Sequence, residues 1–195
     1  MTRRGPASAL RMVVTLASAG LVSGSALASV YMATAPRIAR HQQAALAKAV
    51  LAVVPGAARF EALPGRRNVY ATFTPDGRPA GLAIQAEGPG FMDTIRLLYG
   101  FRPESRTITG LAILDSRETP GLGDKIMTDP AFVHSFDALR VDPEIVPVTG
   151  GPTAADNEVD CISGATISSK AVVSILQRSV VGLPSGLTAL PKENR

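Results

Sequence analysis

Hydroxyl-bearing and small side chains gather in one stretch of the sequence, residues 160–170. The apolar run that follows has helical spacing, and it predicts a helix that begins near Ser168, capped by the hydroxyl of Ser168 or Ser169. A helix N-terminus offers unpaired N–H donors and a partial positive charge, which suit a phosphate. The stretch therefore predicts a phosphate-bearing ligand held at, or bonded to, Thr166. A Ser- and Thr-rich helix start without a ligand is the alternative.

A second stretch, residues 118–123, reads Glu-Thr-Pro-Gly-Leu-Gly. Its proline fixes φ, while Gly121 and Gly123 allow backbone conformations that are closed to other residues. Such a loop can let a flat ring lie against its backbone. Leu122 is then placed to cover one face of the ring, with Glu118 and Thr119 contacting its edge. A tight strand-to-helix turn without a ligand is the alternative.

Together the two stretches resemble the signature motifs of the FMN-binding domain family. Its members include the G subunit of the Rnf ion-translocating electron transport complex and the C subunit of sodium-pumping NADH:quinone oxidoreductase, and the compact chain is closer to the former. The resemblance covers most of the chain. It implies that a flavin transferase joins FMN, through its phosphate, to Thr166 as a phosphoester. It also implies cofactor contacts from the other motif residues, which are Ser163, Gly164, Ala165, Ser168, Glu118, Thr119, Gly121, Leu122 and Gly123.

The same resemblance implies a redox subunit of an ion-translocating complex, a translocase of the bacterial inner membrane, with no stand-alone catalysis. Electrons from NADH or ferredoxin would pass through the flavin to other redox centres. The implied partners are the other membrane subunits, including a second flavin-carrying one, and the flavin transferase that matures this chain. The alternative is a structural subunit of the same kind of complex with a vestigial flavin site.

The charge distribution argues against nucleic-acid binding, although the formal net charge of the 195 residues is +4. Residues 1–60 contain seven basic and no acidic residues, whereas residues 61–195 contain 13 basic and 16 acidic residues. The basicity therefore belongs to the N-terminal arm, and the remainder is mildly acidic, without the basic stripe of a nucleic-acid-binding surface.

Cysteine and histidine are scarce, with Cys161, His41 and His134 as the only examples. They leave no intramolecular disulfide and no Cys- or His-rich metal site, so we assign no metal ligand and no catalytic residue. A Cys161–His134 nucleophilic pair is conceivable, but nothing in the sequence places the two residues together. A hydrolase that uses Ser163 or Cys161 would lack a GxSxG elbow and a placed base. A small, buried thiol is the simpler interpretation.

The N-terminal segment predicts a membrane anchor. Residues 12–35 carry no charge, and as a helix they would extend about 36 Å, enough to cross a ~30 Å hydrocarbon core. We predict a cytoplasmic N-terminus over 1–11, a transmembrane helix over 12–35, a helical stalk over 36–56 and a periplasmic FMN-binding domain over 57–195. Basic residues before the anchor outnumber those just after it, which favours this orientation. A signal peptide cleaved after Ala26-Leu27-Ala28 is the alternative.

The rest of the chain has the pattern of an α+β domain. Alternation and turn signals predict strands at 68–74, 80–86, 94–100 and 107–115, with a loop at 88–90. Residues 124–139 are helical in parts, and 144–149 is a possible strand. We therefore expect a single extracytoplasmic domain with a twisted, mostly antiparallel sheet and packed helices.

Overall fold

The computed structural model describes residues 6–151 and 155–183, and its contacts divide the chain into two units, Met1–Ala44 and Ala45–Arg195. Residues 1–5 of the predicted cytoplasmic segment and residues 184–195 of the predicted domain lie outside the described residues. Each unit is described by itself below.

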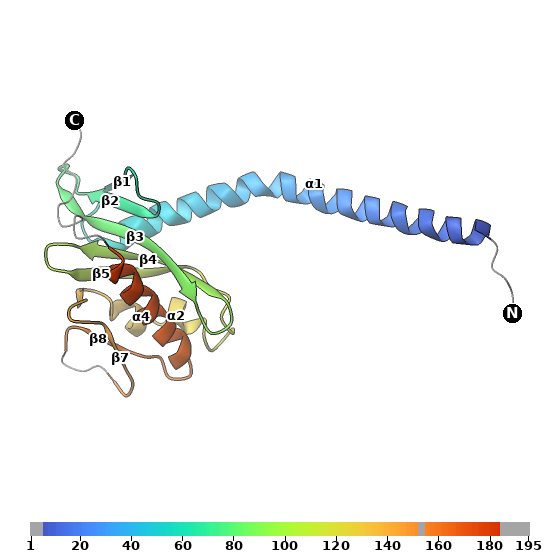
Figure 1. The fold of residues 1–195 in the computed structure, drawn as a ribbon. Coiled ribbons are helices and arrows are strands. Elements are labelled where there is room, and N and C mark those ends of the chain that lie inside the picture. Colours follow the sequence, from blue (N-terminus) through green and yellow to red (C-terminus); the bar gives the residue numbers. More distant parts are fainter. Residues whose placement is uncertain (1–5, 152–154, 184–195) are drawn as a thin grey trace. The chain divides into compact units, whose positions relative to one another are not determined.

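The first unit consists of the greater part of α1, a helix that runs from Pro6 to Val53 (Figure 1). Pro36 lies inside this helix, so the predicted anchor and the predicted stalk as far as Val53 are one continuous helix. Its apolar side chains are largely exposed, as at Leu16 and Met32, which are 74% and 75% exposed. By length and composition Leu10–Val53 can cross a membrane, a criterion that a signal sequence also meets. The boundaries 12–35 and 36–56 stay predictions.

The second unit is built on a twisted six-stranded antiparallel sheet in which every strand pairs with its neighbour in sequence (Figure 1). The strands are β1 (Arg59–Ala62), β2 (Val69–Phe73), β3 (Pro79–Pro89), β4 (Thr94–Arg102), β5 (Thr107–Asp115) and β6 (Leu139–Arg140). The predicted α+β class and mostly antiparallel sheet are confirmed. The predicted loop at 88–90 is wrong at its first two positions, because Gly88 and Pro89 pair with Ile95 and Thr94 and extend β3.

Both faces of this sheet are covered, and alternation along the central strand β4 sends side chains to each face. Ile95, Leu97 and Tyr99 belong to the larger core cluster, whereas Leu98 belongs to the smaller one. The larger cluster lies between the sheet and three helices: α2 (Lys125–Thr128), α3 (Pro130–His134) and α4 (Thr166–Val181). The smaller cluster includes the last residues of α1, Val50 and Val53.

Two glycines let the C-terminal end of α1 approach the sheet backbone. A Cβ atom at Gly100 would lie 2.0 Å from the carbonyl oxygen of Val53, and one at Gly110 would lie 3.0 Å from it. The Thr109 hydroxyl donates a 2.7 Å hydrogen bond to the same oxygen. A side chain at either glycine would therefore displace the end of the helix from β4 and β5.

A parallel pair of short strands, β7 (Val146–Val148) and β8 (Glu158–Asp160), precedes α4. β7 lies inside the strand predicted at 144–149, whereas β8 was not predicted from the sequence. Cys161 extends the pairing by donating its backbone N–H to Val148 at 2.8 Å. The chain is thereby fixed immediately before the stretch that leads to Thr166.

Candidate functional site

The two sequence motifs meet at one cavity of about 290 Å³. Eight of the ten predicted site residues line it: Glu118, Thr119, Leu122, Gly123, Gly164, Ala165, Thr166 and Ser168. The two that do not are Gly121, whose φ of +75° shapes the loop, and Ser163, which lines a separate cavity. The fold thus brings together two stretches about 40 residues apart, at the start of α4.

The start of α4 has no side-chain cap, and the predicted capping by Ser168 or Ser169 is wrong. The helix begins two residues earlier than predicted, at Thr166, so both serines lie within its first turn. The Ser168 hydroxyl donates to Glu118, and the Ser169 hydroxyl donates to the Ala165 carbonyl. First-turn N–H groups have no acceptor within their own helix, so the end of α4 beside Thr166 offers donors to an anion.

Thr166 is half-buried and its hydroxyl is weakly engaged. The nearest acceptor, the carbonyl oxygen of Ile162, lies 3.4 Å away, at the long limit of a hydrogen bond. Gly164 adopts a φ of +82°, a conformation that side chains rarely adopt. A Cβ atom there would meet only the side chain of Leu122, at 3.8 Å. The backbone before Thr166 therefore lies open to a ligand.

Glu118 joins three walls of the cavity. Its Oε1 accepts hydrogen bonds from the backbone N–H groups of Phe91 (2.9 Å) and Met92 (3.0 Å), at the turn between β3 and β4. Its Oε2 accepts a 2.6 Å hydrogen bond from the Ser168 hydroxyl in α4. Burial by itself raises the pKa of Glu118, but the hydrogen bonds from the Ser168 hydroxyl and from the backbone N–H groups of Met92 and Phe91 outweigh this effect, and the net pKa is lowered. The carboxylate is ionised at neutral pH.

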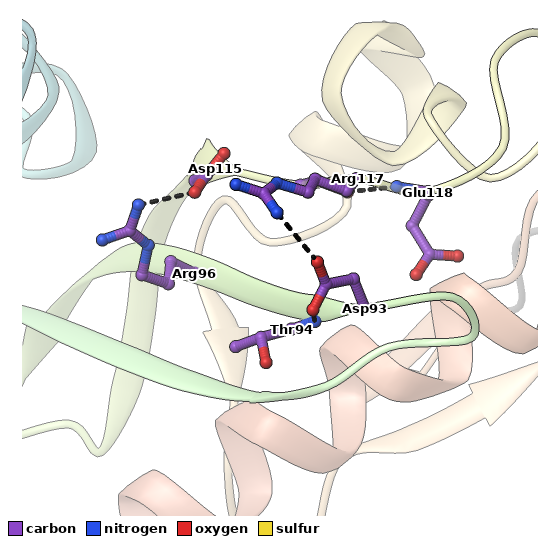
Figure 2. Close-up of polar contacts among 7 residues, drawn as sticks. Asp93, Thr94, Arg96, Asp115, Arg117 and Glu118 are labelled. Atoms are coloured by element: carbon purple, nitrogen blue, oxygen red, sulfur yellow. Dashed lines mark hydrogen bonds and ion pairs between the residues drawn. The ribbon is translucent and has the colours of Figure 1, made fainter. Parts of the chain in front are cut away.

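Ion pairs lie near this carboxylate, at or just outside the ends of β4 and β5 (Figure 2). Arg117 pairs with Asp93 at 3.5 Å, and Arg96 of β4 pairs with Asp115 of β5. Figure 2 shows the Arg117 side chain extending toward Asp93, while the Glu118 carboxylate points away from that guanidinium. The arginine and the glutamate are adjacent in sequence but serve different contacts.

Two further cavity residues, Phe91 and Ile167, were not predicted from the sequence. Each is 59% exposed, and Leu122 beside them is 51% exposed, so the cavity has an apolar rim. Ile167 did carry a signal, since it falls on the same helical face as the exposed Ser174 rather than with the buried apolar residues of α4. The sequence around Phe91 gave no such signal, because the position of Phe91 depends on a hydrogen bond to Glu118, 27 residues away.

A larger cavity of about 670 Å³ is lined in part by His134, Cys161 and Ser163. The structure therefore places Cys161 and His134 at one cavity, which the sequence could not show. Burial raises the pKa of the Cys161 thiol. His134 Nδ1 lies 2.9 Å from an Asp137 carboxylate oxygen. A raised thiol pKa disfavours the thiolate that a cysteine nucleophile requires.

Comparison with known proteins agrees with the geometry. A sequence profile of the FMN-binding domain matches residues 90–181, a range that contains both motifs. The G subunit of the ion-translocating oxidoreductase complex of Methanosarcina acetivorans is 31% identical over 179 residues, which are 87% of this chain and 92% of that protein. The G subunit of the Na⁺-translocating ferredoxin:NAD⁺ oxidoreductase complex of Acetobacterium woodii is 31% identical over 147 residues, 66% of this chain and 69% of that protein.

Solved structures show the same fold. NqrC from Shewanella oneidensis aligns with a TM-score of 0.54 at 22% identity, covering 64% of this chain and 66% of that one. The C subunit of the Na⁺-translocating NADH-quinone reductase from Parabacteroides distasonis aligns with a TM-score of 0.53 at 29% identity, covering 62% of each chain. With both motifs at one cavity and relatives matched over most of their length, the chain belongs to the FMN-binding domain family and, within it, to the G subunits of ion-translocating oxidoreductase complexes.

Proposed function

We propose that this chain is a membrane-anchored electron-transfer subunit of an Rnf-type ion-translocating oxidoreductase complex, and that it carries FMN esterified through its phosphate to Thr166. One observation carries the proposal: Thr166 is the first residue of an uncapped helix, and it lines a cavity that both family motifs form. An electron carrier in such a complex needs a redox group that stays in place, and a covalent link provides this without a binding equilibrium.

The residues around Thr166 fit a phosphate. The uncapped first turn of α4 supplies backbone N–H donors and the positive end of the helix dipole. Gly164 and Ala165 present backbone rather than bulky side chains on the approach. The Thr166 hydroxyl is available to react, since its one hydrogen bond to residues within 6–151 and 155–183 is long. These features support Thr166 as the attachment residue, with Gly164 and Ala165 beside the phosphate.

The attachment step is a phosphoryl transfer to a hydroxyl. A bond forms between Thr166 Oγ1 and the flavin phosphorus, and the hydroxyl proton is lost. The donor is a flavin nucleotide in which that phosphorus belongs to a phosphoanhydride, and the anhydride bond breaks to release a nucleoside monophosphate. No oxidation or reduction occurs. The flavin transferase supplies the catalysis, and this chain supplies the positioned hydroxyl.

The attached flavin would supply one- and two-electron chemistry, and this chain's residues bind and orient it. Glu118 is the one Asp, Glu, His, Lys or Arg side chain in the cavity lining described by the structure, and its two oxygens already accept three hydrogen bonds. An electron relay needs no acid–base pair, so this lining suits a carrier whose donor and acceptor sites lie in other subunits.

The anchor and partners follow from the same proposal. Two relatives are named as subunits of translocating complexes, and the exposed apolar face of α1 suits a single-pass anchor in the bacterial inner membrane. We place residues 12–35 in the membrane, 36–56 in the stalk and 57–195 on the periplasmic side. The partners are the other membrane subunits, a second flavin-carrying one among them, and the flavin transferase.

The test is covalent attachment during co-expression of the full chain with a flavin transferase. The wild-type band should fluoresce as flavin on a denaturing gel, and Thr166→Val should not, since valine has the shape of threonine but no hydroxyl. Ser174→Ala, which removes an exposed hydroxyl from the same helix, should keep the fluorescent band. A dark wild-type band would refute the proposal and favour the structural role with a vestigial site.

A further inference from the structure

The carboxylate of Glu118 is enclosed by three separate segments, which are the β3–β4 turn, its own loop and the first turn of α4. Glu118 is 5% exposed and Ser168 is 3% exposed, so the hydrogen bond between them lies out of water. A Cβ atom at Gly90 would lie 2.4 Å from Glu118 Oε1, and one at Gly123 would lie 2.9 Å from Oε2. A side chain at either glycine would therefore collide with the carboxylate.

Every hydrogen-bond donor to this carboxylate is uncharged. The donors are two backbone N–H groups and one hydroxyl, and no salt bridge to Glu118 occurs within residues 6–151 and 155–183. The nearest arginine in sequence, Arg117, pairs with Asp93 instead. The negative charge is thus stabilised by dipoles but is not neutralised, and its field extends into the cavity that Glu118 lines.

We propose that Glu118 is a positioning residue that fixes the β3–β4 turn, its own loop and the first turn of α4 against one another, and that its uncompensated charge lowers the reduction potential of a flavin held at Thr166. The second part of this inference rests on the proposed function. The first part concerns the chain alone.

The positioning follows from connectivity. Ser168 is two residues after Thr166 in the same helical turn, so the Ser168–Glu118 hydrogen bond fixes the start of α4 that carries Thr166. The same carboxylate holds the turn that presents Phe91 to the cavity rim. The contact between Glu118 and the ring edge stays a prediction, and the hydrogen bonds give Glu118 a further role through the segments that it holds.

The sign of the electrostatic effect follows from charge balance. Two-electron reduction of a flavin with uptake of one proton adds one negative charge to it. A nearby fixed carboxylate disfavours that added charge, because like charges repel most strongly where water is excluded. The group therefore accepts electrons less readily than it would beside a neutral side chain, and its midpoint potential is more negative.

The charge is tested by Glu118→Gln, which keeps the shape and removes the charge, in the full chain with flavin attached. Redox titration with dithionite should give a less negative midpoint potential than wild type. Glu104→Gln is the matched control, because Glu104 is exposed in the turn between β4 and β5. An unchanged midpoint in Glu118→Gln would overturn the electrostatic part, whereas absence of flavin from wild type would refute the proposed function instead.

The positioning is tested without flavin, by hydrogen exchange in the full chain purified in detergent without the transferase. Ser168→Ala keeps the charge but removes one hydrogen bond, and Glu118→Gln weakens all three. Amide exchange at Phe91 and Met92 should become roughly tenfold faster in Glu118→Gln, because a charge-assisted acceptor is lost. In Ser168→Ala, exchange of the Ser169 amide, which donates to the Ala165 carbonyl at the start of α4, should accelerate. Wild-type exchange rates in both variants would overturn the positioning role.

Discussion

Two sets of polar contacts lie side by side at the ends of β4 and β5, and they differ in exposure to water (Figure 2). In the first set, the side chains of Arg96 and Asp115 are 41% and 44% exposed, and that of Arg117 is 78% exposed. In the second, Glu118 is 5% exposed and has no cationic partner among the described residues. The oppositely charged pairs are exposed to water, whereas the single charge of Glu118 is buried.

The difference shows which contacts hold the site. An exposed ion pair replaces contacts that water would make equally well, so its net contribution is about 0–1 kcal/mol. When the donors to a buried carboxylate are removed, water cannot replace the lost hydrogen bonds. The same is true of buried donors when their carboxylate is removed. The hydrogen bonds of Glu118 should therefore control the geometry around Thr166, and the exposed ion pairs should contribute little to it.

The largest effect is expected from Glu118→Ala. It leaves two backbone N–H groups and the Ser168 hydroxyl without their acceptor in a dry site, which should lower the free energy of unfolding by roughly 3–4 kcal/mol. Thermal unfolding of the second unit, followed by circular dichroism in detergent, measures the loss. Glu104→Ala, at an exposed turn, should stay within about 0.5 kcal/mol of wild type. Equal stabilities of the two variants would contradict the comparison.

Gly123→Ala should lower the free energy of unfolding by about 2 kcal/mol, because the new Cβ atom would lie 2.8 Å from both Glu118 Cβ and Ser168 Oγ. Gly121→Ala, two residues earlier, has open space around the new Cβ atom, but the φ of this residue is +75°. The resulting backbone strain should lower the free energy of unfolding by only about 1 kcal/mol. The same unfolding measurement separates the two. A greater loss at Gly121 would show that loop conformation, rather than packing on the carboxylate, governs this region.

Acid should weaken the Glu118 contacts, and the sign follows from the lowered pKa. In the folded protein the pKa of the Glu118 carboxyl is below its ordinary value of about 4.5. Its stabilising contribution is therefore complete above that pH and is lost as the pH falls through the folded value. The difference in melting temperature between wild type and Glu118→Gln should be constant from neutral pH down to the ordinary pKa of about 4.5 and should shrink as the pH falls further. A difference that grows on acidification would contradict this assignment.

The smallest effect is expected at the exposed pair. Arg96→Ala should change stability by less than about 1 kcal/mol, and the change should diminish further in high salt, because both side chains are partly solvated. Unfolding at low and high ionic strength measures it. A loss of stability as large as that of Glu118→Ala would contradict the distinction between the exposed ion pairs and the buried hydrogen bonds of Glu118.

The sequence was informative where the signal is local. The strand at 107–115 was predicted with its observed bounds, since alternation and flanking turn residues are both contained in a short window. The extension of β3 to Pro89 was missed because glycine and proline usually signal a loop. In the structure, Gly88 is needed where a Cβ atom would meet Ile175 of α4 at 2.7 Å.

Contacts between distant segments were beyond local pattern. Ser168 was expected to cap its own helix, which is the common role of a serine near a helix start. Its hydroxyl instead donates to Glu118, 50 residues earlier in the sequence. Strands β6 and β8, of two and three residues, are too short to show alternation. The motifs could therefore be found from the sequence, but the way in which Glu118 connects them could not.

The central claim is tested most directly by peptide mass mapping of the full chain, produced together with a flavin transferase. The peptide that contains Thr166 should be heavier by one FMN less one water, and fragmentation should place the added mass on Thr166. The same peptide from Thr166→Val should have its unmodified mass. An unmodified wild-type peptide, or an addition on another residue, would contradict the account.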